Sequence, residues 1–244
     1  MTKIDAIIKV MEDNGGTANW QIIYDNICKY YPSAKDSEEW QAGLRGVLYR
    51  EIRTSQKPRL KKIGLSIFAL TDYKEEGIPK KKDATRMHSF IEGICLELGN
   101  FNKYLTYTAD PSAVYRDNIR LSNVATMRDM PSFSYNEIVC ETKRIDVVWF
   151  NNKGLAFPKK VFEVVDSIGT LNGAFNRSLQ LNNFLTEFYI VAPEKHREKY
   201  LQTIDLEVYQ LQKERFNFIN YEEIIDLYET TARKNQIENK IFGV

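Results

Sequence analysis

The sequence predicts an α/β (α+β) protein with two domains, and three observations support this. Residues 86–244 alternate strand-like apolar runs with helical patterns, which is typical of an α/β sandwich around a mixed sheet. Residues 1–73 instead contain three amphipathic helical patterns followed by a small hairpin. Residues 74–85 are charged, include Gly77 and Pro79, and have almost no apolar content, as expected of a linker. We therefore expect domains at 1–73 and 86–244, joined by a linker at 74–85.

The N-terminal domain has the layout of a winged helix. The first helix ends at residues 14–16, and the second spans 17–31 and is closed by Pro32. The third helix has an apolar stripe that includes Trp40, Leu44 and Leu48. Residues 59–71 then alternate around a glycine as a hairpin. Three helices followed by a two-stranded wing are typical of this DNA-binding layout.

The polar face of the third helix is the expected DNA reader. It carries side chains suited to base edges and phosphates: Gln41, Arg45, Tyr49, Arg50 and Arg53. Lys61 and Lys62 would lie on the wing, near the DNA backbone. The segment resembles the HARE-type winged helix through its spacing and its closing "GLSIFALT", and this resemblance implies a sensor of DNA modification. The alternative is a domain for protein contacts whose basic residues are merely solvated.

The segment 143–167 is the most informative part of the chain. It places Asp146 and Glu163 in two apolar runs joined by a short polar turn, which predicts a hairpin that brings the two acids together. A charge within an apolar run needs a partner, and converging carboxylates repel unless a cation lies between them. Hard divalent ions such as Mg²⁺ prefer oxygen ligands, so a metal site is expected. Alternatively, either acid points to solvent or pairs with Arg144, which lies two residues from Asp146.

The order "RIDVVW", a turn, "FEVVDS" and a helix resembles the PD-(D/E)xK nuclease superfamily, in its Phe-Glu-Val-x-x-Ser form. Residues 86–113 look like the opening helix and first strand of that domain, so the resemblance covers about 83–193. It implies that Asp146 and Glu163 bind the metal, with Glu92 as a third acid. It also implies Mg²⁺ as the cofactor, with Mn²⁺ as a substitute.

The chain departs from the family pattern at its third motif position. The family has Lys, or sometimes Glu or Gln, two residues after the strand Glu, and this chain has Val165. Valine cannot orient the attacking water or stabilise charge on the phosphate. Candidate substitutes are Gln180, Arg144, and Asp166 if the strand bulges. A degenerate domain that binds DNA without cutting it is therefore the alternative.

The rest of the second domain continues the alternation of helices and strands. Residues 167–185 predict an amphipathic helix whose early polar side carries Asn172, Asn176 and Arg177, placed for phosphate contact or for plain solvation. A strand at 187–193, a helix at 194–204, a final strand at 206–211 and a helical tail from residue 221 are expected next.

The net charge and the cysteine and histidine content limit the classes of function to be considered. The net charge of +1 over 244 residues keeps a protein-interaction adaptor open beside a DNA-binding protein. The three cysteines are widely spaced in apolar surroundings, as expected of reduced core thiols. Only two histidines occur, which argues against a histidine-based nuclease or a His/Cys metal site. No signal peptide or long apolar stretch is evident, so we expect a cytoplasmic protein.

These features together predict a type II restriction-like endonuclease that acts on double-stranded DNA and depends on sequence or on base modification. Cutting both strands requires two active sites, so a homodimer is expected. A DNA methyltransferase acting on the same site would be the cognate partner if modification blocks cleavage.

Overall fold

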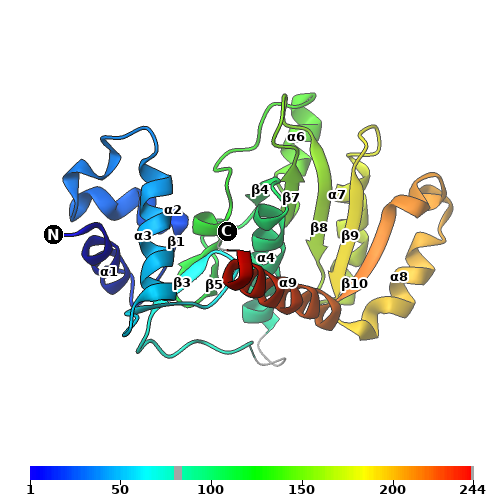
Figure 1. The fold of residues 1–244 in the computed structure, drawn as a ribbon. Coiled ribbons are helices and arrows are strands. Elements are labelled where there is room, and N and C mark those ends of the chain that lie inside the picture. Colours follow the sequence, from blue (N-terminus) through cyan, green and yellow to red (C-terminus); the bar gives the residue numbers. More distant parts are fainter. Residues whose placement is uncertain (80–83, 243–244) are drawn as a thin grey trace. The chain divides into compact units, whose positions relative to one another are not determined.

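The computed structural model describes residues 1–79 and 84–242 (Figure 1). These residues divide into two compact units. The first contains Met1–Gly77, Arg116–Ile119 and the chain from Thr231 onward, and the second contains Ile78–Tyr115 and Arg120–Thr230. The domain boundary and linker expected from the sequence stay predictions, and residues 80–83 of that linker lie outside the described residues.

The first unit is built from three helices and a small sheet. The helices are α1 (Lys3–Asp13), α2 (Trp20–Asn26) and α3 (Trp40–Thr54), with 3-10 helices at Ile27–Lys29 and Pro32–Lys35. Strands β2 (Leu60–Lys62) and β3 (Ile67–Leu70) form the expected antiparallel hairpin. Strand β1 (Thr17–Asn19) pairs antiparallel with the other side of β3.

The second helix is shorter than the sequence predicts. Residues 17–19, expected as its first turn, are extended because they pair with β3, with Thr17 opposite Ala69. Helix α2 begins only after Asn19, whose side chain accepts a hydrogen bond from the backbone N–H of Ile22 at 3.0 Å. An asparagine in this position satisfies a free N–H of the first turn and so favours a helix start there.

The second unit has a five-stranded mixed sheet, which confirms the predicted fold class. The strand order is β10-β9-β8-β7-β4. Strands β4, β7 and β8 are antiparallel neighbours, whereas β8, β9 and β10 run parallel. The strands are β4 (Leu105–Thr108), β7 (Val147–Phe150), β8 (Pro158–Val164), β9 (Glu187–Ala192) and β10 (Phe216–Asn220).

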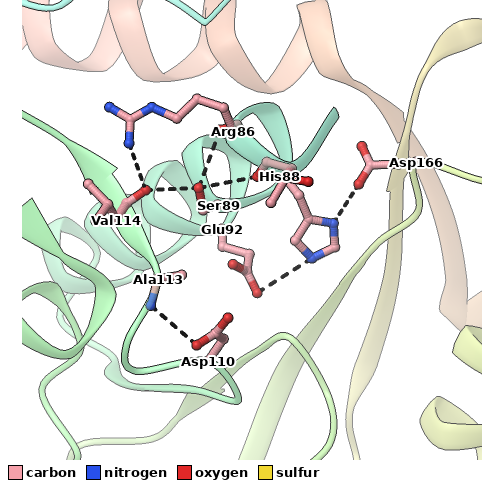
Figure 2. Close-up of a pocket in the computed structure, with 9 residues that line it drawn as sticks. Arg86, His88, Ser89, Glu92, Asp110, Ala113, Val114 and Asp166 are labelled. Carbon is pink, nitrogen blue, oxygen red and sulfur yellow. Dashed lines mark hydrogen bonds and ion pairs between the residues drawn. The ribbon is translucent and has the colours of Figure 1, made fainter. Parts of the chain in front are cut away.

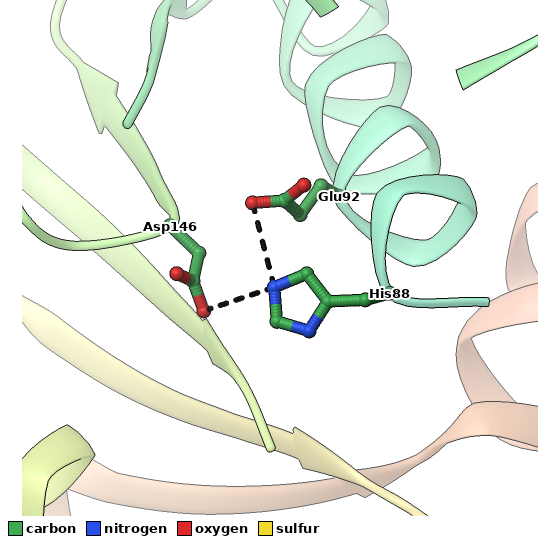
Figure 3. A group of neighbouring side chains, drawn as sticks. All are labelled: His88, Glu92 and Asp146. Carbon is green, nitrogen blue, oxygen red and sulfur yellow. Dashed lines mark ion pairs between the residues drawn. The ribbon is translucent and has the colours of Figure 1, made fainter. Parts of the chain in front are cut away.

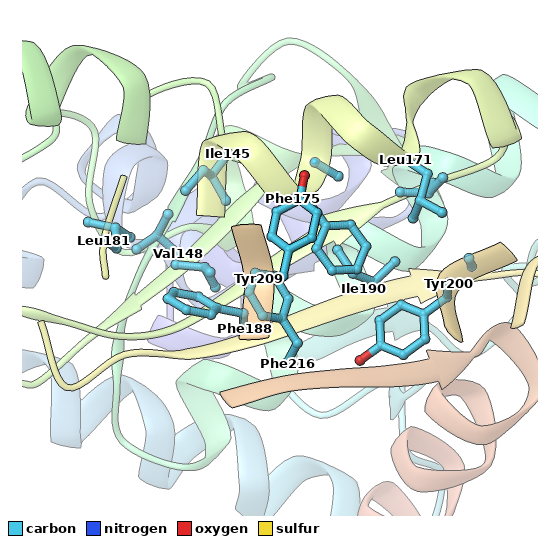
Figure 4. Close-up of a cluster of buried hydrophobic side chains, with 14 of the residues drawn as sticks. Ile145, Val148, Leu171, Phe175, Leu181, Phe188, Ile190, Tyr200, Tyr209 and Phe216 are labelled. Atoms are coloured by element: carbon cyan, nitrogen blue, oxygen red, sulfur yellow. The ribbon is translucent and has the colours of Figure 1, made fainter. Parts of the chain in front are cut away.

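Helices α4 (Ala84–Phe101) and α7 (Leu171–Leu179) cover opposite faces of this sheet. Trp149 of β7 points toward α4, since its Nε1 donates to the carbonyl of Cys95 at 3.1 Å. Val148, its neighbour in the strand, points to the other face and joins the core under α7. In that core the ring of Phe175 stacks on Phe216 with centroids 4.7 Å apart (Figure 4). Helix α8 (Arg197–Ile204) adds to the same core.

A close approach of α4 to the sheet depends on Gly99. A Cβ atom at this position would lie 2.6 Å from Cγ2 of Thr106 and 2.7 Å from Nε1 of Trp149, which is closer than real contacts allow. The glycine therefore lets α4 lie directly against β4 and β7. This matters because α4 carries two of the side chains of the candidate site described below.

The remaining elements connect or flank the sheet. They are the ribbon of β5 (Val114–Arg116) and β6 (Ile119–Arg120), helices α5 (Leu121–Val124), α6 (Asn136–Thr142) and α9 (Tyr221–Phe242), and 3-10 helices at Ile168–Thr170, Glu194–His196 and Glu207–Arg215. None of the helices within residues 1–79 and 84–242 combines the length and apolar content needed to cross a membrane.

The final strand is not where the alternation of apolar residues predicts it. Residues 206–211 lie at the start of the 3-10 helix Glu207–Arg215, and the last strand is β10. The apolar side chains that suggested the strand point outward, and Leu211 is 94% exposed. Phe216 is buried against Phe175 and Phe188 instead, so packing of this ring selects the later segment as the strand.

The expectation of three core thiols is wrong for one cysteine. Cys95 is buried within α4 and Cys28 is half-buried, but Cys140 is exposed. Helix α6 buries Val139 and Thr142, and Cys140 lies on its outer side.

Candidate metal centre

Asp146 stands at the point where β7 and β8 separate. It directly precedes β7, and its Oδ2 accepts a hydrogen bond from the backbone N–H of Val164, the last residue of β8, at 2.7 Å. On its other side, the carbonyl of Asp146 accepts from the N–H of Ala109 at 3.1 Å. The side chain thus replaces a backbone acceptor at the end of the ladder, and the carboxylate is held in place by main-chain contacts.

Helix α4 brings two further ligand-type side chains to Asp146. His88 and Glu92 are four residues apart and therefore share one face of the helix. Nε2 of His88 lies 3.7 Å from Oε1 of Glu92 and 3.9 Å from Oδ2 of Asp146 (Figure 3). One potential ligand atom from each residue lies within 4.8 Å of those of the other two. In the part of the chain that the structure describes, this is the one such group of three or more acids, histidines or cysteines.

Burial and mutual repulsion make the two acids of this group reluctant to ionise together. Glu92 is 2% exposed, and burial followed by the charge of Asp146 raises its pKa to about 8. Burial also raises the pKa of Asp146. For His88, burial acts to lower the pKa, but the hydrogen bond to Asp166 and the nearby carboxylates outweigh it and raise the pKa to about 9. A divalent ion bound here would displace the protons that these raised pKa values keep on Glu92 and His88.

The imidazole of His88 is oriented by contacts at Nδ1, the nitrogen remote from Glu92 and Asp146. Its Nδ1 lies 2.7 Å from Oδ2 of Asp166, which follows β8, and the hydroxyl of Tyr221 at the start of α9 donates to Oδ1 of Asp166 at 2.5 Å. Nε2 is thereby turned toward Glu92 and Asp146. A carboxylate on the remote nitrogen is the usual support of a histidine that binds metal.

The group opens onto a polar cavity of about 620 Å³ (Figure 2). His88 and Glu92 form part of its wall. The other lining residues are Thr85, Arg86, Ser89, Asp110, Ala113, Val114 and Asp166. Arg86 places a cationic side chain at this cavity and donates to the carbonyl of Val114 at 3.4 Å. A ligand in the cavity would therefore meet both the acidic group and a guanidinium.

Glu163, the second acid expected at the metal, lies outside the group. It is completely buried, and its carboxylate forms a two-point pair with Arg177 of α7, in which Nε donates to Oε1 at 2.8 Å and Nη2 donates to Oε2. Burial raises the pKa of Glu163 to about 8 although Arg177 acts to lower it. The two strand acids are thus contacted from different helices, Asp146 by α4 and Glu163 by α7. The role of Glu163 as a metal ligand stays a prediction.

Two of the three residues suggested to replace the motif lysine have other partners. Arg144 pairs with Glu141 at 3.3 Å, and Gln180 donates to the carbonyl of Asn176 at 3.3 Å. Val165 is buried in the core under α7. Asp166 alone among the candidates contributes, as the partner of His88.

The polar side of α7 is only partly open to solvent. Asn172 and Asn176 are exposed, and Asn176 also accepts a hydrogen bond from the hydroxyl of Tyr209 at 3.0 Å. Arg177 is engaged with Glu163. Contacts of these three side chains with a phosphate stay predictions.

His88 is the member of the candidate centre that sequence reasoning missed. The low histidine count argued against a histidine site, and the family motifs directed attention to the strands. The available signal was the spacing of four residues between His88 and Glu92 in the opening helix, which places both on one face.

The residues of the expected reading helix and wing lie in the first unit. Gln41, Arg45 and Arg50 are exposed on α3, and Tyr49 packs edge-on against Phe68 with centroids 5.8 Å apart.

Three cations of this region have partners within the unit. Arg53 lies over the ring of Tyr49 at 5.2 Å and donates to Oδ1 of Asn239 at 3.4 Å. Lys62 donates to Oδ1 of Asn235 at 2.6 Å. Lys61 donates to the carbonyl of Tyr73 at 2.8 Å and pairs with Glu75. Any DNA contact by these three side chains would have to share or replace these interactions.

Comparison with known proteins gives one match. The model of the family described as "Type II restriction enzyme NmeDI C-terminal domain" matches residues 69–241. Neither the search of curated proteins nor the search of solved structures found a match. The matched range contains all three residues of the candidate metal centre together with Asp166 and Tyr221.

Proposed function

The chain belongs to the family of the type II restriction enzyme NmeDI C-terminal domain, and from this premise we propose that it is an endonuclease that hydrolyses phosphodiester bonds of double-stranded DNA with a divalent metal ion. Family membership supports a restriction-endonuclease-like nuclease. The observation that carries the metal-dependent part is the convergence of His88, Glu92 and Asp146 beside a polar cavity.

The residues present fit a divalent ion. One buried carboxylate, one half-buried carboxylate and an imidazole supply three ligand atoms, and burial raises the pKa of both carboxyl groups. A bound ion would activate water for attack on the phosphate and offset the developing charge. Asp146, held by the N–H of Val164, and His88, held by Asp166, would keep the ligands oriented. Arg86 would bind a phosphate oxygen at the cavity wall.

The relationship to PD-(D/E)xK nucleases remains part of this proposal. It is supported by the antiparallel β7–β8 hairpin, by Asp146 at its open end and by an acid, Glu92, on the preceding helix. Asp146 is assigned as a metal ligand both from the sequence motif and from the group of His88, Glu92 and Asp146. The two assignments differ in its partner, which is Glu163 in the first and Glu92 with His88 in the second.

We propose that the first unit reads the DNA as a winged helix. Three helices followed by the β2–β3 hairpin support this, together with the exposed polar side chains of α3. The reading depends on sequence or on base modification. A homodimer would provide the two active sites needed for cutting both strands, and a methyltransferase of the same specificity would protect the host if modification blocks cleavage.

Incubation of the purified full chain with plasmid DNA tests the proposal. Modified and unmodified DNA should be compared with Mg²⁺, with Mn²⁺ and with a chelator. We expect cleavage of one of the two DNA types that requires the metal and is abolished in Asp146→Asn, while DNA binding persists because the reading surface is unchanged. Normal cleavage by Asp146→Asn would show that the catalytic metal is not bound at Asp146.

A DNA-binding protein that retains the nuclease fold without cutting is the second candidate. Two observations favour it: Val165 replaces the motif lysine, and Glu163 is paired with Arg177. Salt-dependent DNA binding without cleavage under all of these metal conditions would establish it in place of the enzyme.

A further inference from the structure

The candidate centre offers a nitrogen ligand atom as well as oxygen ligand atoms. His88 contributes a nitrogen, whereas Glu92 and Asp146 contribute carboxylate oxygens. Mg²⁺ is bound through oxygen ligands and retains several waters, and imidazole is a ligand of first-row transition ions. The presence of an imidazole in the group therefore bears on which ion the site prefers.

The separations of the ligand atoms suit one common ion. Two atoms that are each about 2.1 Å from an ion can be at most about 4.2 Å apart. Nε2 of His88 lies 3.7 Å from Oε1 of Glu92 and 3.9 Å from Oδ2 of Asp146. The ligand atoms of Glu92 and Asp146 lie within 4.8 Å of each other, so all three atoms can reach a single ion with small adjustments of the side chains.

Glu92 independently indicates a ligand at this position. Its side chain is only 3% exposed, yet it makes no hydrogen bond to any residue that the structure describes. Its nearest cationic contact is Nε2 of His88, at 3.7 Å, which is too long for a hydrogen bond. A buried carboxyl group without hydrogen bonds is costly to ionise unless a cation satisfies it, and otherwise it keeps its proton.

Asp166 and Tyr221 make His88 a positioned ligand. The contacts of Asp166 with His88 Nδ1 and with the hydroxyl of Tyr221 join residues from α4, from the end of β8 and from α9. With Nδ1 engaged in this way, Nε2 is the nitrogen that faces the two acids. A supporting carboxylate of this kind also raises the basicity of the ligand.

We propose that His88, Glu92 and Asp146 form a mixed nitrogen and oxygen site that prefers a divalent transition-metal ion such as Mn²⁺ to Mg²⁺, with Asp166 and Tyr221 as positioning residues for the imidazole. The inference rests on the proposed metal site of the nuclease and names its ion. It reverses the order that the family resemblance implies, in which Mg²⁺ comes first.

Metal binding without DNA tests the proposal. Calorimetric titration of the full chain with Mn²⁺ and with Mg²⁺ should give at least a tenfold tighter dissociation constant for Mn²⁺. His88→Asn, which offers an amide oxygen in place of the nitrogen, should reduce this ratio to below threefold. Asp166→Asn should weaken Mn²⁺ binding by about 10–100-fold, as for other residues that support a metal ligand. Electron paramagnetic resonance of bound Mn²⁺ should detect nitrogen coordination that is absent in His88→Asn.

Controls separate loss of the ligand from loss of the fold. Glu141→Gln removes an acid of the same unit that pairs with Arg144, and it should keep the native ratio. Circular dichroism and thermal melting should verify that each variant is folded. Should His88→Asn be unfolded, the Asp166→Asn titration and the resonance spectrum of the native chain decide the matter.

The outcomes also separate this inference from the proposed function. A Mn²⁺ preference below tenfold in the native chain, or one that persists in His88→Asn, overturns the inference even if Mg²⁺-dependent cleavage is observed. Conversely, the chain could show a tenfold Mn²⁺ preference that depends on His88 and yet not cut DNA. That result would support the inference and overturn only the nuclease proposal.

Discussion

Glu163 and Arg177 form a two-point ion pair, in which both carboxylate oxygens accept hydrogen bonds from one guanidinium. Glu163 has no exposed surface, so the guanidinium supplies the positive charge that the buried carboxylate needs. The acid that the strand motif assigns to the metal is thus already paired with a helix residue. Glu92, by contrast, is buried without a hydrogen-bonding partner among the described residues.

This contrast predicts different effects of removing the two charges. Glu92→Gln should weaken Mn²⁺ binding by tenfold or more, because it removes a ligand. Glu163→Gln should leave metal affinity within about twofold and lower the free energy of unfolding by about 1–3 kcal/mol, because Arg177 loses its charged acceptor. Calorimetry and denaturant unfolding measure the two effects. The reverse pattern of metal affinities would mean that Glu163 is the ligand and that Arg177 leaves it in the loaded protein.

The raised pKa of Glu92 predicts how stability depends on pH. Its pKa is about 8 in the folded chain against an ordinary 4.5, so the folded state binds more protons than the unfolded state between these values. Stability of the metal-free protein should therefore fall as pH rises from about 5 to 8. In Glu92→Gln the fall should be shallower by up to about 1.4 kcal/mol per pH unit. Urea unfolding in chelator checks this, with Glu141→Gln as control; equal slopes for native chain and Glu92→Gln would contradict it.

Val165 provides a test of the motif position itself. It is 1% exposed and packs with Ile145 and Val148 in the core under α7. Val165→Lys should therefore destabilise the second unit by about 3–5 kcal/mol, since a charge would be buried without a partner, and it should not increase cleavage. Val165→Leu, which keeps the position apolar, is the matched control. A stable and more active lysine variant would indicate that this position faces the reaction centre.

Arg45 and Arg53 differ in their surroundings and should differ in their effect on DNA binding. Arg45 is exposed and makes no hydrogen bond or ion pair with the residues described here, whereas Arg53 contacts Tyr49 and Asn239. Arg45→Ala should weaken binding more than Arg53→Ala. Loss of a base contact costs about 1–3 kcal/mol at one position, and loss of a phosphate contact lowers the salt slope by about one.

Gel shifts at several salt concentrations measure these effects. Arg59→Ala is the control, because Arg59 pairs with Glu51 and Asp5 within the unit. If neither Arg45→Ala nor Arg53→Ala alters binding, α3 is not the reading helix.

Local periodicity was enough to predict much of the fold. The alternating strands and helices of the second unit, the β7–β8 hairpin and the three helices of the first unit all follow from patterns within about ten to twenty residues. Where the apolar pattern was ambiguous, side-chain packing determined which segment forms the strand. Residues 206–211 alternate like a strand, but Phe216 provides the ring that fits between Phe175 and Phe188, so β10 begins there.

The sequence by itself determined that Asp146 and Glu163 belong to the two segments of a hairpin and that His88 and Glu92 share a helix face, because these relations depend on nearby residues. Only the tertiary structure decided which of them meet. His88 and Asp166 are 78 residues apart, and Asp166 and Tyr221 are 55 apart. Such contacts arise when α4 and α7 pack on opposite faces of the sheet, which gives Asp146 the side chains of α4 and Glu163 the guanidinium of α7. Helix packing across a sheet is a long-range property that no local pattern encodes.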